Sequence, residues 1–305
     1  MAAVEVEGLR KAYGDVAAVD GIDLTIDDGE VVALLGPNGA GKTTAVEILE
    51  GYRRRDAGTV RVLGMDPQTG GREFRERIGV VLQEAGFEEL FTPRELVRLH
   101  AGYYPRPRAV DDVLALTGLE EKADARVRTL SGGQRRRLDL ALGIVGRPEM
   151  LFLDEPTTGF DPSARRRAWE LVDRLRDLGA TILLTTHYLD EAEHLADRVV
   201  VVDHGRVVAE GTPAELATAA GLAPVISFRL PAGTGVAELP TLGADRRQVG
   251  DVVEVRTTSA TADVATLASW ALGRGVELAD LSLVRPSLED VYLDLVGEQP
   301  GGPVS

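Results

Sequence analysis

The sequence contains no cysteine and only three lysines, Lys11, Lys42 and Lys122. The absence of cysteine excludes disulfides, thiolate metal ligands and thiol nucleophiles. The scarcity of lysine beside abundant arginine is typical of a GC-rich genome, and it makes the position of Lys42 informative. Acidic residues outnumber basic ones, with 49 Asp and Glu against 34 Lys and Arg, so the formal net charge is −15. This balance argues against broad, nonspecific binding of nucleic acid, which depends on basic groups that neutralise phosphates.

Long apolar runs are also missing. A membrane-spanning helix needs roughly 18 or more consecutive apolar residues, whereas Val199–Val202 is short and charged residues interrupt every longer run. Residues 1–5 lack the positive and apolar regions of a secretory signal. We therefore expect a cytoplasmic protein, in which any action at a membrane requires another polypeptide to supply the spanning helices.

The chain of 305 residues is long enough for two domains of unequal size. Over residues 1–220 short apolar strands alternate with helices, which predicts a mostly parallel α/β sheet. The expected strands are Val4–Leu9, Gly21–Ile26, Val31–Leu35, Met150–Leu153, Thr181–Thr185, Val199–Asp203 and Arg206–Glu210. The expected helices are Thr43–Leu49, Thr92–His100, Val110–Leu116, Gln134–Val145, Ser163–Leu178 and Asp190–Ala196.

The pattern changes near residue 221, after a helix that begins at Thr212-Pro213. Residues 221–297 predict a small α+β domain, and residues 298–305 predict a loose tail. We expect this domain to be a packing or dimer-stabilising module without a ligand. Its expected strands are Val225–Leu230, Val252–Thr257 and Leu278–Val284, and its expected helices are Asp263–Leu272 and Ser287–Leu295.

A glycine-rich loop, Gly36–Thr44, lies between the buried strand Val31–Leu35 and a helix. Its pattern is that of a phosphate loop, in which backbone N–H groups cradle phosphate oxygens. In this pattern Lys42 places a cation on the β- and γ-phosphates, and the Thr43 hydroxyl binds Mg²⁺. The candidate nucleotide-binding residues of the loop are Gly36, Asn38, Gly39, Ala40, Gly41, Lys42, Thr43 and Thr44.

Two carboxylates, Asp154 and Glu155, follow the apolar strand Met150–Leu153. The carboxyl end of a strand is where an open α/β sheet binds phosphates. There Asp154 suits a water-mediated contact to Mg²⁺, and Glu155 can polarise the attacking water as a general base.

A second glycine-rich turn, Leu130–Gln134, leads into a helix and forms another anion site. Together with the phosphate loop and the Asp154-Glu155 pair, it resembles the ATP-binding subunits of ABC transporters over nearly all of residues 1–220. The resemblance implies a P-loop ATPase core with a helical subdomain at about residues 84–145. It also implies that Ser131, Gly132, Gly133 and Gln134 bind the γ-phosphate of an ATP held by the phosphate loop of a second copy.

The same resemblance assigns roles to four more residues. Tyr13 matches the aromatic that stacks on adenine, and Gln83 matches the glutamine that joins Mg²⁺ and opens the helical subdomain. Asp161 matches the dimer-contact loop, in which Phe160 replaces the usual leucine. His187 matches the switch histidine that contacts the γ-phosphate. The resulting catalytic set is Glu155, His187, Lys42 and Gln83, and the metal set is Thr43, Gln83 and Asp154.

Two segments resemble the daunorubicin-resistance-like drug exporters within this family, namely the signature helix Leu130–Leu142 and the C-terminal stretch Arg285–Leu293. The resemblance implies a Mg²⁺-dependent ATPase, working as a head-to-tail dimer and powering export of a drug-like compound through a separate permease. Such a subunit lies at the inner face of the membrane, and Glu84–Phe91 is its expected contact with the permease. Two alternatives to an exporter subunit are an importer subunit and a soluble ATPase of the same family acting on nucleic acid or ribosomes.

Three arginine triplets remain, at residues 53–55, 135–137 and 165–167. Solvated helix and loop surfaces explain them most simply. We therefore expect these arginines to lie on the surface.

Overall fold

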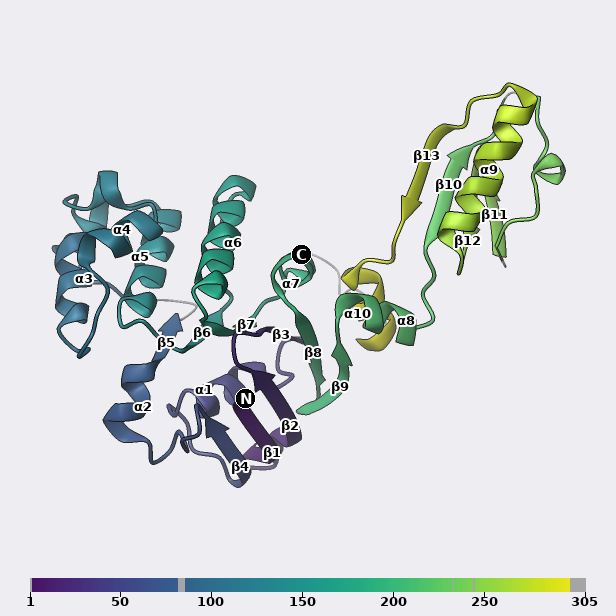
Figure 1. Ribbon diagram of the computed structural model, residues 1–305. Coiled ribbons are helices and arrows are strands. Elements are labelled where there is room, and N and C mark those ends of the chain that lie inside the picture. The colour runs from purple at the N-terminus through teal and green to yellow at the C-terminus, as the bar shows by residue number, and fades with distance from the viewer. Residues whose placement is uncertain (1, 82–85, 232, 244, 297–305) are drawn as a thin grey trace, which may run out of the picture. The chain divides into compact units, whose positions relative to one another are not determined.

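The computed structural model describes residues 2–81, 86–231, 233–243 and 245–296 (Figure 1). Contacts divide the chain into two units, Met1–Thr212 and Pro213–Ser305. The helix that starts at Pro213 belongs to the second unit, whereas the sequence places the change of domain at residue 221. Within the described residues, no helix is long and apolar enough to cross a membrane.

A six-stranded sheet forms the centre of the first unit, in the order β5-β6-β7-β3-β8-β9. Five strands run parallel, and β9 pairs antiparallel with β8 at one edge. Every residue of β3 and β7 is buried, as expected of apolar strands covered on both faces. The strands are β3 (Val31–Leu35), β5 (Ile78–Val81), β6 (Met150–Asp154), β7 (Thr181–Thr185), β8 (Arg198–Asp203) and β9 (Arg206–Gly211).

A second, antiparallel sheet has the order β2-β1-β4 (Figure 1). Its strands are β1 (Ala2–Tyr13), β2 (Val16–Asp27) and β4 (Ala57–Val62). Alternating residues of these strands are buried, and they share one hydrophobic core with α1 (Lys42–Leu49) and the central sheet. This core fixes the position of the loop that precedes α1.

The remaining helices of the first unit are α2, which contacts β5, and two further groups. Helices α3, α4 and α5 contact one another, and capping boxes at Thr92 and Ser131 fix the starts of α3 and α5. Helices α6 and α7 also pack together. The helices are α2 (Gly71–Arg77), α3 (Pro93–Ala101), α4 (Val110–Leu116), α5 (Gly132–Ile144), α6 (Pro162–Asp177) and α7 (Leu189–Leu195), with short 3-10 turns η1 (Glu120–Lys122) and η2 (Val127–Thr129).

The second unit is a four-stranded antiparallel sheet in the order β11-β12-β10-β13, with its own apolar core. Ile226, Phe228, Val253 and Val255 of the sheet pack with Leu267 of α9. Its elements are α8 (Pro213–Ala219), β10 (Val225–Arg229), η3 (Val236–Glu238), β11 (Asp245–Val249), β12 (Val252–Arg256), α9 (Ala260–Arg274), β13 (Ala279–Val284) and α10 (Leu288–Val296).

The predicted α/β class is confirmed, and so are the expected elements, with shifts of a few residues at their ends. The sequence did not provide bounds for β4, α2, β5 and β11, nor for the short turns η1, η2 and η3. Strand β11 (Asp-Arg-Arg-Gln-Val) is almost wholly exposed, so it carries no apolar alternation. Backbone pairing with β12, rather than a pattern of its own, makes it a strand.

Candidate nucleotide site

The loop between β3 and α1 is held so tightly that two of its glycines admit no side chain. A Cβ atom at Gly36 would lie 2.0 Å from the Val202 carbonyl oxygen, and one at Gly41 would lie 2.0 Å from the Ala18 carbonyl oxygen. Both glycines have positive φ, +154° and +100° respectively. The loop backbone is therefore packed directly against β8 and β2, and glycine-rich loops of this kind are candidates for phosphate binding.

Lys42 begins α1 directly after the left-handed Gly41. Its ammonium group donates to the carbonyl oxygens of Gly36 and Pro37, at 2.7 and 3.0 Å. Burial lowers the pKa of Lys42, while the carboxylates of Glu155 and Asp154 act in the opposite direction. These contacts fold the cation over the loop. Thr43, the next residue, is exposed at the first turn of the helix.

Asp154 and Glu155 are fixed by the neighbouring strand β7. The Thr185 hydroxyl donates to Asp154 Oδ1, and the Glu155 N–H donates to both the carbonyl and the hydroxyl oxygen of Thr185, at 3.0 and 3.2 Å. The Thr158 hydroxyl donates to Glu155 Oε2 at 3.0 Å. Glu155 itself has φ +47°, a conformation that costs a non-glycine residue about 1–2 kcal/mol.

His187 lies in the loop after β7, with its side chain about half exposed. Its Nδ1 is 3.4 Å from Glu155 Oε2, and its ring lies against that of Tyr188 with 4.0 Å between the centroids. The imidazole thus touches the carboxylate at the carboxyl edge of the sheet.

Sheet order explains why these residues meet. The phosphate loop follows β3, Asp154 and Glu155 end β6, and His187 follows β7, and β7 lies between β6 and β3. Because the three strands are parallel, their carboxyl ends share one edge of the sheet. A cation, two carboxylates and an imidazole therefore converge beside the phosphate loop.

The second glycine-rich turn forms the N-terminus of α5. The Ser131 hydroxyl accepts from the Gln134 N–H at 3.3 Å, and the Gln134 side chain accepts from the Ser131 N–H at 2.9 Å. A Cβ atom at Gly132 would meet nothing within 4 Å, and one at Gly133 only Phe160, at 3.9 Å. Helix α1 packs against β2 and β4, whereas α5 packs against β5, α3 and α4. The two turns thus belong to different parts of the first unit.

Tyr13 and Asp161 lie at the ends of elements. Tyr13 ends β1 with 43% of its surface exposed, and the cations of Lys11 and Arg53 lie 5.6 and 5.3 Å from its ring centroid. Asp161 caps α6 by accepting from the N–H groups of Ser163 and Ala164, both at 2.9 Å. These bonds hold the pKa of Asp161 below its usual value.

Gln83 lies outside the described residues, as does the start of the expected permease contact at Glu84. Two residues that the sequence reading did not assign to the site reach it. Thr185 binds both carboxylate residues, and its only sequence signal is its place at the end of an apolar strand. Arg136 was expected on the surface, but it is 9% exposed and binds the backbone of residues 154–156. For Arg136 the surface prediction is wrong.

Glu50, just after α1, is a further carboxyl group near the site. Burial, followed by the nearby charges of Asp154 and Glu47, raises its pKa to about 8. The environment of Glu50 thus favours the neutral form of its carboxyl group over the charged form.

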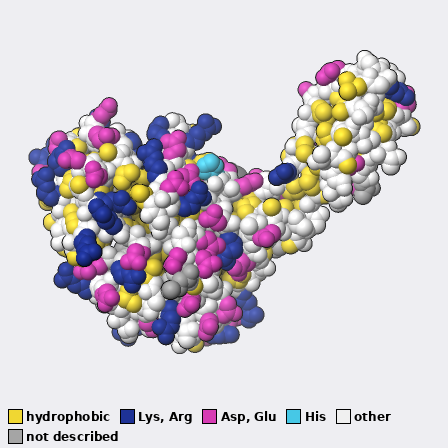
Figure 2. Space-filling view, in the orientation of Figure 1, with side chains coloured by type: hydrophobic (Ala, Val, Ile, Leu, Met, Phe, Trp, Pro, Cys, Tyr) yellow, Lys and Arg dark blue, Asp and Glu magenta, His cyan; other side chains and the backbone are white. Residues whose placement is uncertain are grey.

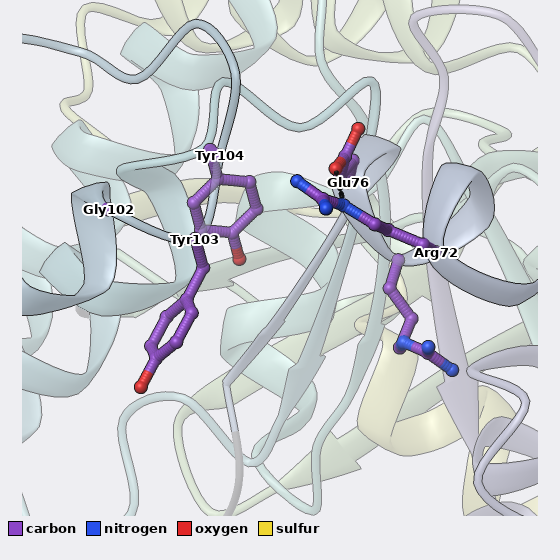
Figure 3. Close-up of a pocket in the computed structure, with 6 residues that line it drawn as sticks. Arg72, Glu76, Gly102, Tyr103 and Tyr104 are labelled. Atoms are coloured by element: carbon purple, nitrogen blue, oxygen red, sulfur yellow. Dashed lines mark hydrogen bonds and ion pairs between the residues drawn. The ribbon is translucent and has the colours of Figure 1, made fainter.

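A cavity of about 540 Å³ lies elsewhere in the first unit, between α2 and the end of α3 (Figure 3). Tyr103 and Tyr104 line one side, and Arg72 and Glu76, which form an ion pair, line the other. It contains no residue of the glycine-rich loop or of the β6 end, so this cavity does not coincide with the candidate phosphate site. A phosphate loop is instead an open surface of backbone groups.

Known proteins resemble this chain over nearly its whole length. The ABC transporter family matches residues 19–158, and the C-terminal domain family of ABC transporter domain-containing proteins matches residues 224–287. Daunorubicin resistance ATP-binding protein DrrA3 of Streptomyces coeruleorubidus is 42% identical, covering 97% of this chain and 96% of its own. Nod factor export ATP-binding protein I of Ralstonia nicotianae is 44% identical, covering 70% of this chain and 68% of its own.

Solved structures match about 70% of the chain. An ATP-binding subunit of an ABC transporter has a TM-score of 0.66 and 28% identity, covering 72% of this chain and 93% of its own. A dimeric ATP-binding cassette bound to ADP and phosphate has a TM-score of 0.63 and 25% identity, covering 68% of this chain and 98% of its own. The chain belongs to the ATP-binding subunits of ABC transporters, within the group that resembles the daunorubicin-resistance proteins.

Proposed function

We propose that this chain hydrolyses ATP and thereby drives export of a drug-like or antibiotic-like compound through a separate membrane permease. The observation that carries the proposal is the convergence of Lys42, Asp154, Glu155 and His187 at one edge of the parallel sheet, beside a glycine cradle. Daunorubicin resistance and Nod factor export, the roles named for the relatives, support export over import.

The residues present fit a nucleotide with Mg²⁺. Backbone packing excludes a side chain at Gly36 and Gly41, Lys42 supplies a cation at the end of the loop, and Thr43 is exposed at the first turn of α1. The hard oxygen donors of Thr43, Asp154 and Gln83 are the kind that Mg²⁺ prefers. The ion, when bound, neutralises charge that develops on the transferred phosphoryl group.

The chain's own residues then act on water and phosphate. Glu155 Oε2 accepts a proton from the attacking water as general base, and His187, which touches the same oxygen, orients that water. Lys42 moves from the loop carbonyls to phosphate oxygens. Its attraction to the phosphate charge is strong there because the site is partly desolvated. The Ser131 hydroxyl accepts from Gln134, which leaves its own proton to donate to a phosphate oxygen.

The working unit we propose is a head-to-tail dimer. Each phosphate loop binds an ATP whose γ-phosphate is completed by Ser131, Gly132, Gly133 and Gln134 of the second copy. Support comes from the open glycines of that turn, from the different packing of α1 and α5, and from the dimeric cassette that resembles 68% of this chain. Tyr13 stacks on the adenine, and Asp161 contacts the second copy.

The remaining roles are proposed as well. Residues 1–220 form the ATP-binding domain, with a helical subdomain at about 84–145, and residues 221–297 stabilise the dimer by packing. The permease holds the complex at the inner face of the membrane. An ATPase acting on nucleic acid is disfavoured by the net charge of −15. On the face in Figure 2, described acidic and basic side chains are interspersed over the first unit.

Glu155→Gln tests the assignment of the base. Replacing a general base lowers turnover by about 10²–10⁴-fold, while ATP binding is retained, so the variant should accumulate as an ATP-bound dimer. Glu121→Gln, at an exposed position of η1, is the control with the same change of charge. Phosphate release and size-exclusion chromatography with ATP give the two readouts. Near-normal hydrolysis by Glu155→Gln would show that Glu155 is not the base.

A further inference from the structure

Arg136 is the middle arginine of the triplet at residues 135–137 and lies in α5. It binds the segment that carries the proposed base. Its guanidinium donates to three consecutive carbonyl oxygens, those of Asp154 at 2.6 Å, Glu155 at 3.0 Å and Pro156 at 3.1 Å. It also donates to Asp139 Oδ2 at 3.0 Å. Only the planar fork of an arginine presents several donors in such a fixed arrangement. The side chain thus holds the backbone around Glu155 through hydrogen bonds.

These hydrogen bonds are important because Glu155 has an unfavourable backbone conformation. Its φ of +47° persists only if the surroundings hold it on both sides. Its N–H donates to Thr185 of β7, and its carbonyl oxygen accepts from Arg136 of α5 at 3.0 Å and from the Thr158 N–H at 3.2 Å. The direction in which the Glu155 carboxylate projects therefore depends on where α5 places the guanidinium.

The second glycine-rich turn, Leu130–Gln134, which we call the signature turn, lies at the N-terminus of the same helix α5. Ser131 and Arg136 are five positions apart, which is roughly 7.5 Å along a helix axis at 1.5 Å per residue. The intervening segment is regular helix closed by the Ser131–Gln134 capping box. A shift of the turn is therefore transmitted to Arg136 as a rigid-body shift.

We propose that Arg136 is a positioning residue that links the two nucleotide sites of the dimer. The signature turn of one chain completes the site of its partner, and Arg136 on the same helix sets Glu155 in the chain's own site. Closure over one ATP thereby aligns the base for the other. This proposal rests on the roles proposed above for Glu155 and for the turn.

The surroundings of Arg136 favour this role over that of a simple brace. Burial lowers the pKa of Arg136, and the carboxylates of Asp139, Asp154 and Glu191 oppose that lowering. Burial also raises the pKa of Asp139 to about 6. A buried ion pair is a poor source of net stability compared with apolar packing. Its geometry instead fixes a particular backbone conformation, that of residues 154–156.

Arg136→Lys in the full chain tests the proposal, because lysine keeps the charge beside Asp139 but loses the fork. We expect kcat for ATP hydrolysis to fall at least about tenfold, as small displacements of catalytic groups do, with the ATP dissociation constant changed less than about twofold. The Hill coefficient for ATP should also fall towards one. Arg137→Lys is the matched control, since Arg137 is the next residue and donates to the Gly118 carbonyl oxygen. It should keep wild-type kcat.

A double variant separates a positioning role from a structural one. In a Glu155→Gln background, measured by single-turnover hydrolysis, Arg136→Lys should cause no further loss, because it acts through Glu155. The same loss in both backgrounds would overturn the proposal, as would wild-type kcat and Hill coefficient in Arg136→Lys. Asp139→Asn, which keeps the volume of the side chain, should lower kcat in the same direction and serves if Arg136→Lys fails to fold.

The outcome also distinguishes this proposal from the proposed function. If Glu155→Gln alone retains turnover, the assignment of the base is wrong whatever Arg136 does. If Glu155→Gln abolishes turnover while Arg136→Lys is normal, only the link between the sites is wrong.

Discussion

Thr185→Val removes a hydroxyl that holds both carboxylate residues without creating a cavity. Thr185 is 2% exposed, and its hydroxyl donates to Asp154 Oδ1 and accepts from the Glu155 N–H. The Glu155 N–H keeps its bond to the Thr185 carbonyl oxygen, so the main loss is the bond to Asp154. A hydrogen bond to a charged group contributes about 1.5–3 kcal/mol.

Because Asp154 is the proposed partner of Mg²⁺, we expect the loss to appear in the metal dependence. Outer partners of metal ligands typically change metal affinity by about 10–100-fold when they are removed. The assay is a Mg²⁺ titration of ATP hydrolysis at saturating ATP. The half-maximal Mg²⁺ concentration should rise by about that factor, and Thr185→Ser, which keeps the hydroxyl, should restore it.

Thr181→Val is the matched control for this experiment. Thr181 begins the same strand, is also 2% exposed, and accepts one hydrogen bond from the Gly29 N–H at 2.9 Å, away from the carboxyl edge. It should lower the unfolding temperature without changing the Mg²⁺ dependence. Equal Mg²⁺ curves for Thr185→Val and Thr181→Val would refute the reasoning.

Two further predictions concern the phosphate loop and its surroundings. Gly41→Ala should abolish nucleotide binding, because a Cβ at Gly41 would lie 2.0 Å from the Ala18 carbonyl oxygen. It should also destabilise the first unit by more than the ~1–2 kcal/mol expected for Gly14→Ala, since a Cβ at Gly14 meets nothing within 4 Å. Equal unfolding temperatures of the two variants would contradict the close approach. Glu50→Gln removes a carboxyl group whose pKa rises from 4.5 to about 8 on folding. Because the pKa is raised, the neutral carboxyl stabilises the wild type at low pH, and this stabilisation is lost as the pH rises from 4.5 to about 8. The free energy of unfolding in urea of Glu50→Gln should therefore increase relative to that of the wild type by about 4 kcal/mol over this range. Parallel pH profiles would exclude burial of the charge.

Much of the site could be predicted from sequence because its signals are local. The phosphate loop needs glycines at fixed spacing, and those glycines occur between a buried strand and a helix. Glu155 follows directly from the end of an apolar strand. Thr185 and Arg136 could not be found in this way. The partners of Thr185 lie 30 and 31 residues away, and the backbone partners of Arg136 at residues 154–156 lie 18 to 20 residues away. They become neighbours only through strand pairing and helix packing.

The C-terminal unit illustrates the same limit. Its apolar strands β10 and β12 could be predicted from their residues, since Ile226, Phe228, Val253 and Val255 alternate towards one face. Strand β11 could not, because four of its five side chains are polar and its backbone pairing with β12 decides its conformation. Backbone hydrogen bonding between strands leaves little trace in side-chain composition.

The sequence by itself determined the chemistry of this protein. Glycine spacing, Lys42 and the Asp154-Glu155 pair specify phosphate binding and hydrolysis because each depends on residue type at a short, fixed separation. Only the tertiary structure decided which groups act together. The order β6-β7-β3 brings His187 and Thr185 to the carboxylates, and the packing of α5 buries one arginine of three so that it grips the backbone of Glu155. Such contacts arise from the register of strands and the direction of a helix face, which a linear pattern does not encode.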